Sequence, residues 1–332
     1  APVAEQRAVQ RAQLGGRGDP ARGLGVELAE PLQRAVLRFA QQLDAHGRGH
    51  FQRAALRLVV LPGGQRRAVV AQAAPPGRAF GGAIAEEDPA AGAIHADHVR
   101  LGARMVPFTG WDMPVQYTSV LAEHHAVRRS VGMFDVSHMT FLELTGHDAV
   151  AYLQRILAND VARLKIAGKA LYSGMLNEQG GVIDDLIVYA PTVQQPNIWR
   201  VIVNCGTHDK DLAWMQAHAA NFRVSLKERT DLAMLAVQGS KAYRVVSDIL
   251  GAEAGAIIQS LKVFQGREYN DWFIARTGYT GEEGLEILVP QAQVAEFWQQ
   301  LLAAGVLPCG LAARDTLRLE AGMNLYGNEM TD

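Results

Sequence analysis

The chain has 332 residues, of which 48% are hydrophobic and 20% are charged, and these fractions are ordinary for a globular protein. Its formal net charge of -2 excludes the basic excess that favours nucleic acid or an anionic membrane as a partner. No apolar run reaches the roughly 18 residues that cross a bilayer. The two cysteines, Cys205 and Cys309, are too few for a disulfide framework or a zinc site, so we expect a reduced, cytosolic type of compartment and no metal.

The first 98 residues use a restricted set of amino acids. They contain no Lys, Ser, Thr, Asn, Tyr, Trp, Cys or Met, but they hold 22 Ala and 12 Arg. A targeting presequence is disfavoured because such peptides are rich in Ser, and a nucleic-acid arm is disfavoured because the arginines are scattered. We favour an Ala/Arg-rich extension over residues 1–94 that is non-native or disordered, such as high-GC DNA read in the wrong frame. This interpretation predicts that deleting residues 1–94 leaves activity intact.

Two regular elements are compatible with this extension. Apolar residues at helical spacing predict an amphipathic helix over residues 31–43. The apolar run over residues 56–61 is compatible with a strand. Neither segment carries a chemical motif.

From about His95 the composition becomes ordinary, and helices and strands mix irregularly. Residues 119–130 predict a helix with Ser119 as its N-cap. Strands are predicted over residues 140–145, 182–189, 199–204, 232–238 and 272–277. Further helices are predicted near residues 146–158, 207–219, 240–250, 291–304 and 311–321. Because no strict strand–helix–strand rhythm is present, an α+β fold is favoured over a doubly wound sheet.

Two adjacent carboxylates lie within the apolar stretch GGVIDDLIVY, residues 180–189. Successive side chains on a strand point to opposite faces, so Asp184 and Asp185 must point apart, each among apolar neighbours. A buried carboxylate is costly unless it is paired or hydrogen-bonded. From the residues alone, hydrogen bonding to nearby backbone in a turn is favoured over a chemical role.

Common catalytic signatures are missing from the sequence. Neither GxGxxG nor GxxxxGK followed by Ser or Thr occurs, so neither a dinucleotide-binding fold nor a phosphate loop is supported. His124 and His125 are adjacent instead of four apart, so they do not form the helical pair that binds a metal. The sequence therefore predicts no nucleotide or metal centre of these kinds.

Four stretches are loop-rich and polar where a fold would not require it: GWDMPVQY at 110–117, GMFDVSHM at 132–139, ARTGYTGEEGLEI at 275–287 and GLAARDTLRLEAGMNLYGNEM at 310–330. Taken with YSGMLNEQGGVIDDLIVY at 172–189, they closely resemble the glycine cleavage system T-protein, an aminomethyltransferase family. The resemblance covers about residues 95–332 and implies an α+β folate-binding domain there. Because that family continues past the YGNEM motif, the resemblance also implies that its C-terminal β-barrel domain is absent from this chain.

The resemblance implies a one-carbon transfer. The lipoyl arm of the partner H-protein would supply an aminomethyl group, tetrahydrofolate would accept its methylene as co-substrate, and ammonia would leave. Such chemistry needs a folate nitrogen held near the carbon and a carboxylate that steers protons. A bacterial-type cytoplasmic location is implied, with the mitochondrial matrix as the alternative. No metal, nucleic acid or membrane is expected to take part.

The resemblance also implies roles for individual residues. Asp185 matches the family's essential carboxylate and is implied to be catalytic, while Asp184 is expected to face away and bridge backbone. Glu286 is implied to accept hydrogen bonds from the pterin NH groups, and Arg314 to contact the benzoyl-glutamate end of the folate. The residues implied to line the folate pocket are Met139, Tyr172, Ile202 and Tyr279.

Rival functions stay open at this point. Folate-dependent demethylases of sarcosine and dimethylglycine share the fold family but usually carry a separate flavin domain, and none is seen in this sequence. A folate-binding branch linked to iron–sulfur assembly has a KGCxxGQE-type motif, where this chain reads GMNLYGNEM. A non-catalytic folate-binding fragment is the third alternative. Release of ammonia from aminomethyl-lipoyl H-protein would separate it from an enzyme.

Overall fold

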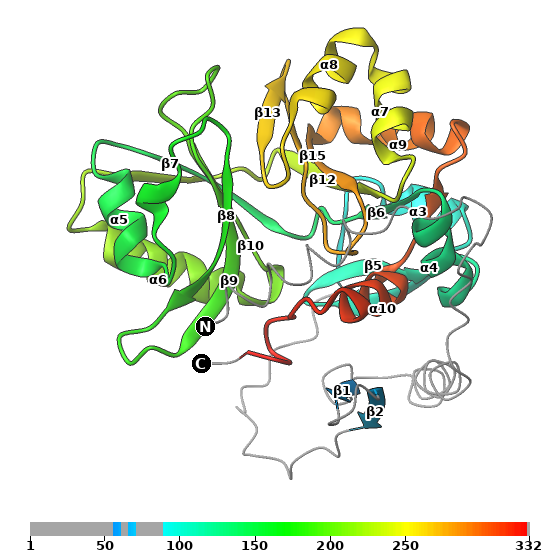
Figure 1. Cartoon of the computed structure of the whole chain (residues 1–332), viewed down its shortest axis with the longest axis horizontal. Coiled ribbons are helices and arrows are strands. Elements are labelled where there is room, and N and C mark those ends of the chain that lie inside the picture. The colour runs from blue at the N-terminus through cyan, green and yellow to red at the C-terminus, as the bar shows by residue number, and fades with distance from the viewer. Residues whose placement is uncertain (1–55, 61–65, 71–88, 331–332) are drawn as a thin grey trace, which may run out of the picture. The chain divides into compact units, whose positions relative to one another are not determined.

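The structure is a computed structural model that describes residues 56–60, 66–70 and 89–330 (Figure 1). The chain divides into two compact units, Ala1–Gly81 and Gly82–Asp332. In the first unit, β1 (Leu56–Val60) and β2 (Arg66–Val70) form an antiparallel pair. All other elements named below belong to the second unit.

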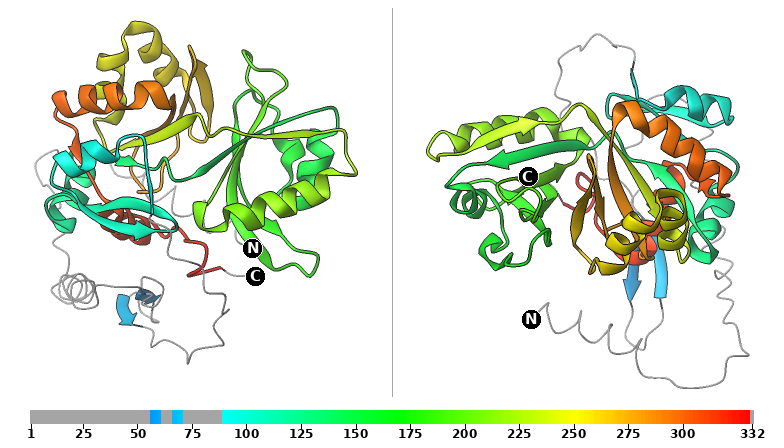
Figure 2. Two further views of the ribbon diagram at one scale, coloured as in Figure 1. Left: turned by 180° about the vertical axis from the view of Figure 1, so that it is seen from behind. Right: turned by 90° about the horizontal axis from the view of Figure 1, so that it is seen from above.

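A five-stranded antiparallel sheet forms one part of the second unit, in the order β11, β7, β10, β9 and β8. Its strands are β7 (Thr140–Thr145), β8 (Ala170–Leu176), β9 (Val182–Tyr189), β10 (Trp199–Val203) and β11 (Ser225–Glu228). Two helices, α5 (Ala149–Ile156) and α6 (His208–Ala219), cover one face of this sheet (Figure 2). Leu153 of α5 and Met215 of α6 share a buried core with Val201 of β10, which explains why that face is apolar.

A six-stranded sheet forms the other part, in the order β13, β14, β15, β12, β6 and β16. Its strands are β6 (Gly132–Asp135), β12 (Leu232–Gln238), β13 (Gly266–Tyr269), β14 (Trp272–Ala275), β15 (Gly284–Pro290) and β16 (Leu307–Pro308). Three helices share a core with one face of this sheet: α7 (Ala242–Leu250), α8 (Ala252–Ser260) and α9 (Gln291–Ala303). Trp298 of α9 is 0% exposed and packs in this core.

The two sheets meet through a third apolar core. Tyr189 and Ile202 enter it from the five-stranded sheet, and Leu288 enters it from the six-stranded sheet. Because side chains alternate along a strand, Asp185 lies on the same face as Tyr189, and Glu286 lies on the same face as Leu288. The fold therefore places both carboxylates on the inner faces that the two sheets turn toward each other.

A smaller sheet and several helices complete the second unit. They are β3 (Ala90–Ala91), β4 (Arg104–Phe108), β5 (Trp111–Gln116), α3 (His95–Arg100), α4 (Val120–Arg129), α10 (Leu311–Ala321), η1 (Val161–Arg163) and η2 (Cys205–Thr207). Helix α10 contacts both α4 and β5. Within the described part of the chain, no helix combines the length and the apolar character that a membrane crossing requires.

The predicted mixed α and β architecture is confirmed. Three predicted strands match the structure at both ends: residues 140–145, 182–189 and 232–238. Ser119 caps α4 as predicted, because its Oγ atom accepts a hydrogen bond from the Ala122 N–H at 3.1 Å. Strand β1 confirms the element expected over residues 56–61, whereas the helix expected over residues 31–43 lies outside the described residues.

Two stretches that we expected to be loop-rich are instead largely strands. GWDMPVQY contains β5, and GMFDVSHM contains β6, in which every residue is buried. Their Gly, Asp and Pro residues are typical of turns, but tertiary packing overrides that preference. Pro114 lies where the pairing of β4 with β5 changes register, a place where a strand tolerates a residue without an N–H.

Candidate functional site

Asp184 points to the side of the five-stranded sheet that α6 covers. Its side chain is 0% exposed. The carboxylate accepts hydrogen bonds from the backbone N–H of Asn204 at 3.1 Å and from the Asn204 Nδ2 atom at 2.8 Å. Asp184 therefore joins β9 to the residue that follows β10, which confirms that it faces away and bridges backbone.

Asp185 points to the inner face of the sheet and is partly buried. It accepts hydrogen bonds from the Tyr172 hydroxyl at 2.7 Å and from the Asn204 Nδ2 atom at 2.8 Å. Burial raises the pKa of the Asp185 carboxyl above its usual range, and the negative charge of Asp184 adds to the rise, while these two hydrogen bonds oppose it. A carboxylate with a raised pKa is a better proton acceptor near neutral pH than an ordinary aspartate.

Glu286 lies on β15 of the six-stranded sheet. Its side chain is largely buried, and its Oε2 atom accepts a hydrogen bond from the Thr277 hydroxyl at 2.7 Å. The Thr277 hydroxyl is also 3.2 Å from the hydroxyl of Tyr189, which belongs to β9. A buried chain of hydroxyl groups thus links the Glu286 carboxylate to the five-stranded sheet.

Arg314 and Tyr279 form a stacked pair beside Glu286. The Arg314 guanidinium lies 4.6 Å from the centre of the Tyr279 ring, and its Nη1 atom is buried without a hydrogen-bond partner among the described residues. Burial lowers the pKa of Arg314, and the negative charge of Glu286 opposes this. Burial also raises the pKa of the Tyr279 hydroxyl to about 12, and that hydroxyl donates to the backbone oxygen of Asn324.

The structure brings most of the predicted site residues to one region. Tyr172, 42% exposed, holds Asp185, and the charge of Asp185 in turn raises the pKa of Tyr279. Ile202 is buried in the core between the sheets, directly opposite Ile187 on β9, so it lies on the same face as Asp185. The side chain of Met139 packs against the same core.

Arg318, one turn after Arg314, is engaged elsewhere. Its Nε atom donates to Asp315 at 2.8 Å, and its Nη1 atom donates to Glu329 at 3.0 Å. The Asp315 contact has the i, i+3 spacing that a helix allows. Arg318 is thus held by carboxylates, whereas the buried Nη1 atom of Arg314 has no hydrogen-bond partner among the described residues.

Sequence reasoning missed two residues that hold the carboxylates in place. Asn204 follows β10 and donates to both Asp184 and Asp185. Thr277 follows β14 and donates to Glu286. The sequence marks both residues only by their position, because each is a polar residue at the end of a predicted apolar strand.

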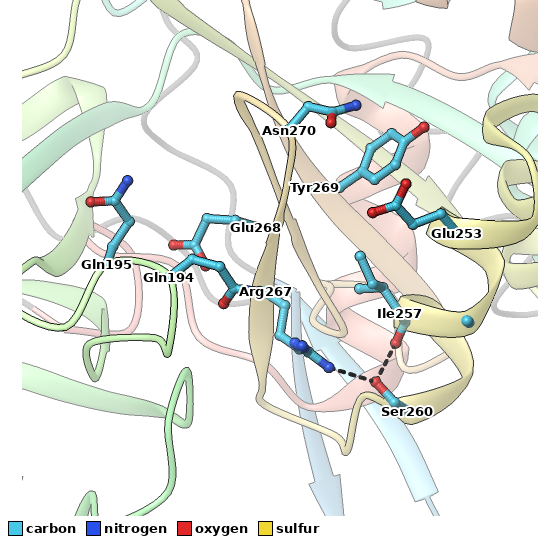
Figure 3. Close-up of a pocket in the computed structure, with 10 residues that line it drawn as sticks. Gln194, Gln195, Glu253, Ile257, Ser260, Arg267, Glu268, Tyr269 and Asn270 are labelled. Atoms are coloured by element: carbon cyan, nitrogen blue, oxygen red, sulfur yellow. Dashed lines mark hydrogen bonds between the residues drawn. The ribbon is translucent and has the colours of Figure 1, made fainter.

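A separate hollow of about 530 Å³ lies beside β13 and α8 (Figure 3). Its lining includes Glu253, Arg267 and Tyr269, and it includes none of the predicted site residues. The Arg267 side chain there donates to the Ser260 hydroxyl at 3.5 Å. None of the residues in the sequence motifs lines this hollow, so it is not the candidate site.

Among the described residues, no group of three or more His, Cys, Asp or Glu side chains could hold a metal ion.

Comparison with known proteins identifies the family. A family model described as GCVT N-terminal domain matches residues 94–332. The chain belongs to this family. An aminomethyltransferase of Alcanivorax borkumensis is 54% identical over 240 residues, which make up 72% of this chain and 66% of that protein. An aminomethyltransferase of Chromobacterium violaceum is 58% identical over 235 residues, which make up 71% of this chain and 64% of that protein.

A solved structure agrees with the fold. The crystal structure of glycine cleavage system aminomethyltransferase T from Bartonella henselae superposes with a TM-score of 0.67 at 37% identity, covering 73% of this chain and 65% of that one. The predicted resemblance to the glycine cleavage T-protein family is therefore confirmed. The chain spans about two thirds of the length of each of these relatives.

Proposed function

We propose that the chain transfers a methylene group from the aminomethyl-lipoyl arm of the glycine cleavage H-protein to tetrahydrofolate, with release of ammonia, as a step in glycine catabolism. Its relatives are named aminomethyltransferases, and the solved relative is named for the glycine cleavage system, which supports this reaction. The observation that carries the proposal is the position of Asp185, a carboxylate with a raised pKa, on an inner sheet face near Tyr279.

Asp185 is the proposed catalytic residue. When the folate nitrogen bonds to the methylene carbon, it must lose a proton, and a carboxylate with a raised pKa can accept it. The negative charge of Asp185 also stabilises the positive charge that develops near the carbon as the amine leaves. Tyr172 fixes the orientation of this carboxylate through its 2.7 Å hydrogen bond.

Glu286 and Arg314 are the proposed anchors of the folate. Thr277 donates to one oxygen of Glu286, and a carboxylate has acceptor capacity for further donors such as the adjacent NH groups of a pterin. The buried, unpartnered Nη1 atom of Arg314 fits an anionic or carbonyl oxygen of the benzoyl-glutamate part. The proposed walls of the pocket are Met139, Tyr172, Ile202 and Tyr279.

The proposed domain boundaries and location follow the family. We place the folate-binding domain over residues 95–332 and treat residues 1–94 as an extension outside it. The proposed protein partner is lipoylated H-protein, and the proposed location is the cytoplasm. The proposed reaction uses no metal, nucleic acid or membrane.

The test is a turnover assay with aminomethyl-lipoyl H-protein and tetrahydrofolate, in which ammonia and 5,10-methylenetetrahydrofolate are both measured. We expect both products from the wild type, and a loss of about a hundredfold or more in Asp185→Asn, because general acid–base groups contribute about this much. Asp248→Asn is the matched control, because that side chain is 69% exposed on α7. Equal rates in the two variants would exclude a catalytic role for Asp185.

A second candidate function is a folate-binding module without turnover. The acceptor capacity of Glu286 and the unpartnered Nη1 atom of Arg314 would serve binding without turnover, and these observations favour the module. The same assay separates the two functions. Saturable binding of tetrahydrofolate without release of ammonia would identify the binding module.

A further inference from the structure

Helix α6 brings a third carboxyl group to the Asp184–Asp185 pair. The Asp211 side chain is 0% exposed, and no donor group among the described residues reaches either of its oxygens in good hydrogen-bonding geometry. Its carboxyl lies close enough to that of Asp184 for the two groups to interact. An aspartate buried in this way is costly as an anion, so its protonation state needs an explanation.

The hydrogen-bond donors around the two carboxyl groups indicate which of them carries a proton. Two carboxyl groups can share a hydrogen bond only when one of them is protonated. Asp184 already accepts two N–H groups from Asn204, as an anion does, whereas no described N–H group donates to Asp211. Burial is the largest cause that raises the pKa of Asp211 well above its usual range. The neighbouring Asp184 carboxyl adds to the rise, and the Thr207 hydroxyl opposes it.

The consequence passes through Asn204 to the inner face of the sheet. The Asn204 Nδ2 atom is 2.8 Å from the Asp184 Oδ1 atom and 2.8 Å from the Asp185 Oδ1 atom. Both amide hydrogens are therefore used, and rotating the amide would place its oxygen against two carboxylates. The orientation of Asn204 thus depends on Asp184 remaining an anion.

We propose that Asp211 is a positioning residue, which carries a proton at neutral pH and donates it to Asp184, so that the Asp184 anion holds the Asn204 amide against Asp185. The three carboxyl groups then share two negative charges. The effect on turnover rests on the function proposed for Asp185, whereas the protonation of Asp211 does not depend on it.

The surroundings of Asp211 contain few other charges. Three elements pack against α6: β9, η2 and α5. Their titratable groups are Asp184, Asp185 and Tyr189 on β9, Cys205 in η2, and Tyr152 and the exposed Arg155 on α5, and Lys210 lies next to Asp211 on α6 itself. Burial raises the pKa of Cys205 and of Tyr152, so both stay neutral near pH 7. The Thr207 hydroxyl and Lys210 both favour the ionised form of Asp211, but burial and Asp184 outweigh them.

The first test needs no substrate. Infrared difference spectra of the full chain at pH 7 detect the C=O stretch of a buried protonated carboxylic acid. We expect the band in the wild type and in Asp209→Asn, and its loss in Asp211→Asn. Asp209 is the matched control, because its fully exposed side chain lies on the same helix. A band that persists unchanged in Asp211→Asn would overturn the proposal.

The second test uses the pH dependence of unfolding. The folded chain keeps a proton on Asp211 above pH 3.8, where an unfolded aspartate releases it. The unfolding equilibrium constant of the wild type should therefore rise with pH relative to that of Asp211→Asn, by up to about tenfold per pH unit. A ratio that stays constant between pH 4 and pH 8 would contradict a protonated Asp211.

The third test is turnover. We expect Asp211→Leu to lower kcat/KM by about tenfold or more, since a small displacement of a reacting group can cost about a hundredfold. Asp211→Asn should restore most of the loss, because its amide can still donate to Asp184. Equal losses in the two variants would refute the positioning role. An inactive wild type that shows the infrared band would support the protonated pair and refute the function proposed for Asp185.

Discussion

The substitution Thr277→Val tests the buried polar chain that holds Glu286. Thr277 is 6% exposed, and its hydroxyl lies 2.7 Å from a Glu286 oxygen and 3.2 Å from the Tyr189 hydroxyl. Valine keeps the shape but removes both hydrogen bonds. A hydrogen bond to a charged group contributes about 1.5–3 kcal/mol and a neutral one about 0.5–1.5 kcal/mol. We therefore expect the free energy of unfolding to fall by about 2–4 kcal/mol.

Urea unfolding followed by tryptophan fluorescence measures this loss. All five tryptophans lie in the second unit, between Trp111 and Trp298, so the signal reports on its fold. Thr230→Val is the matched control at an exposed position. The loss should shrink when Tyr189→Phe is already present, because the neutral bond is then gone. A loss of less than about 0.5 kcal/mol, which is typical of surface substitutions, would refute the reasoning.

Two further predictions concern other buried charged or titratable groups. Glu123→Ala should lower the free energy of unfolding by about 3 kcal/mol or more, because the buried Glu123 carboxylate accepts the N–H groups of Tyr117, Thr118 and Gly310 at 2.7, 2.9 and 2.8 Å. A loss in the free energy of unfolding below about 1 kcal/mol, measured by urea unfolding, would contradict this prediction. Burial lowers the pKa of His138 from 6.5 to about 4, so the unfolded chain binds a proton first and stability is lost as pH falls through this window. His138→Phe should remove up to about 1.4 kcal/mol per pH unit of that acid sensitivity, and an unchanged pH dependence of unfolding would refute it.

The sequence was most informative where a local pattern decides the structure. The strand over residues 182–189 was predictable because apolar side chains fill both of its faces. Strands β5 and β6 were not predicted, because their Gly, Asp and Pro residues resemble turn signals. Their burial depends on neighbouring strands that are distant in sequence.

The residues of the candidate site were likewise only partly predictable from the sequence. Asp184 and Asp185 were visible as two carboxylates inside an apolar strand, and alternation predicted that they point apart. Asn204 was marked only by its position at the end of a predicted strand, and Asp211 was not marked at all, because it is an ordinary polar residue on a helix. Their importance depends on the packing of α6 against β9, which no local pattern encodes.

The most direct test of the central claim is a calorimetric titration of the full chain with tetrahydrofolate. We expect saturable binding at one site in the wild type and in Arg244→Met, an exposed matched control on α7. Arg314→Met and Glu286→Ala should each weaken binding by about tenfold or more, because each removes a charged hydrogen-bonding group. Absence of binding in a wild-type chain that fluorescence shows to be folded, or equal affinity in all the variants, would contradict a folate site between the two sheets.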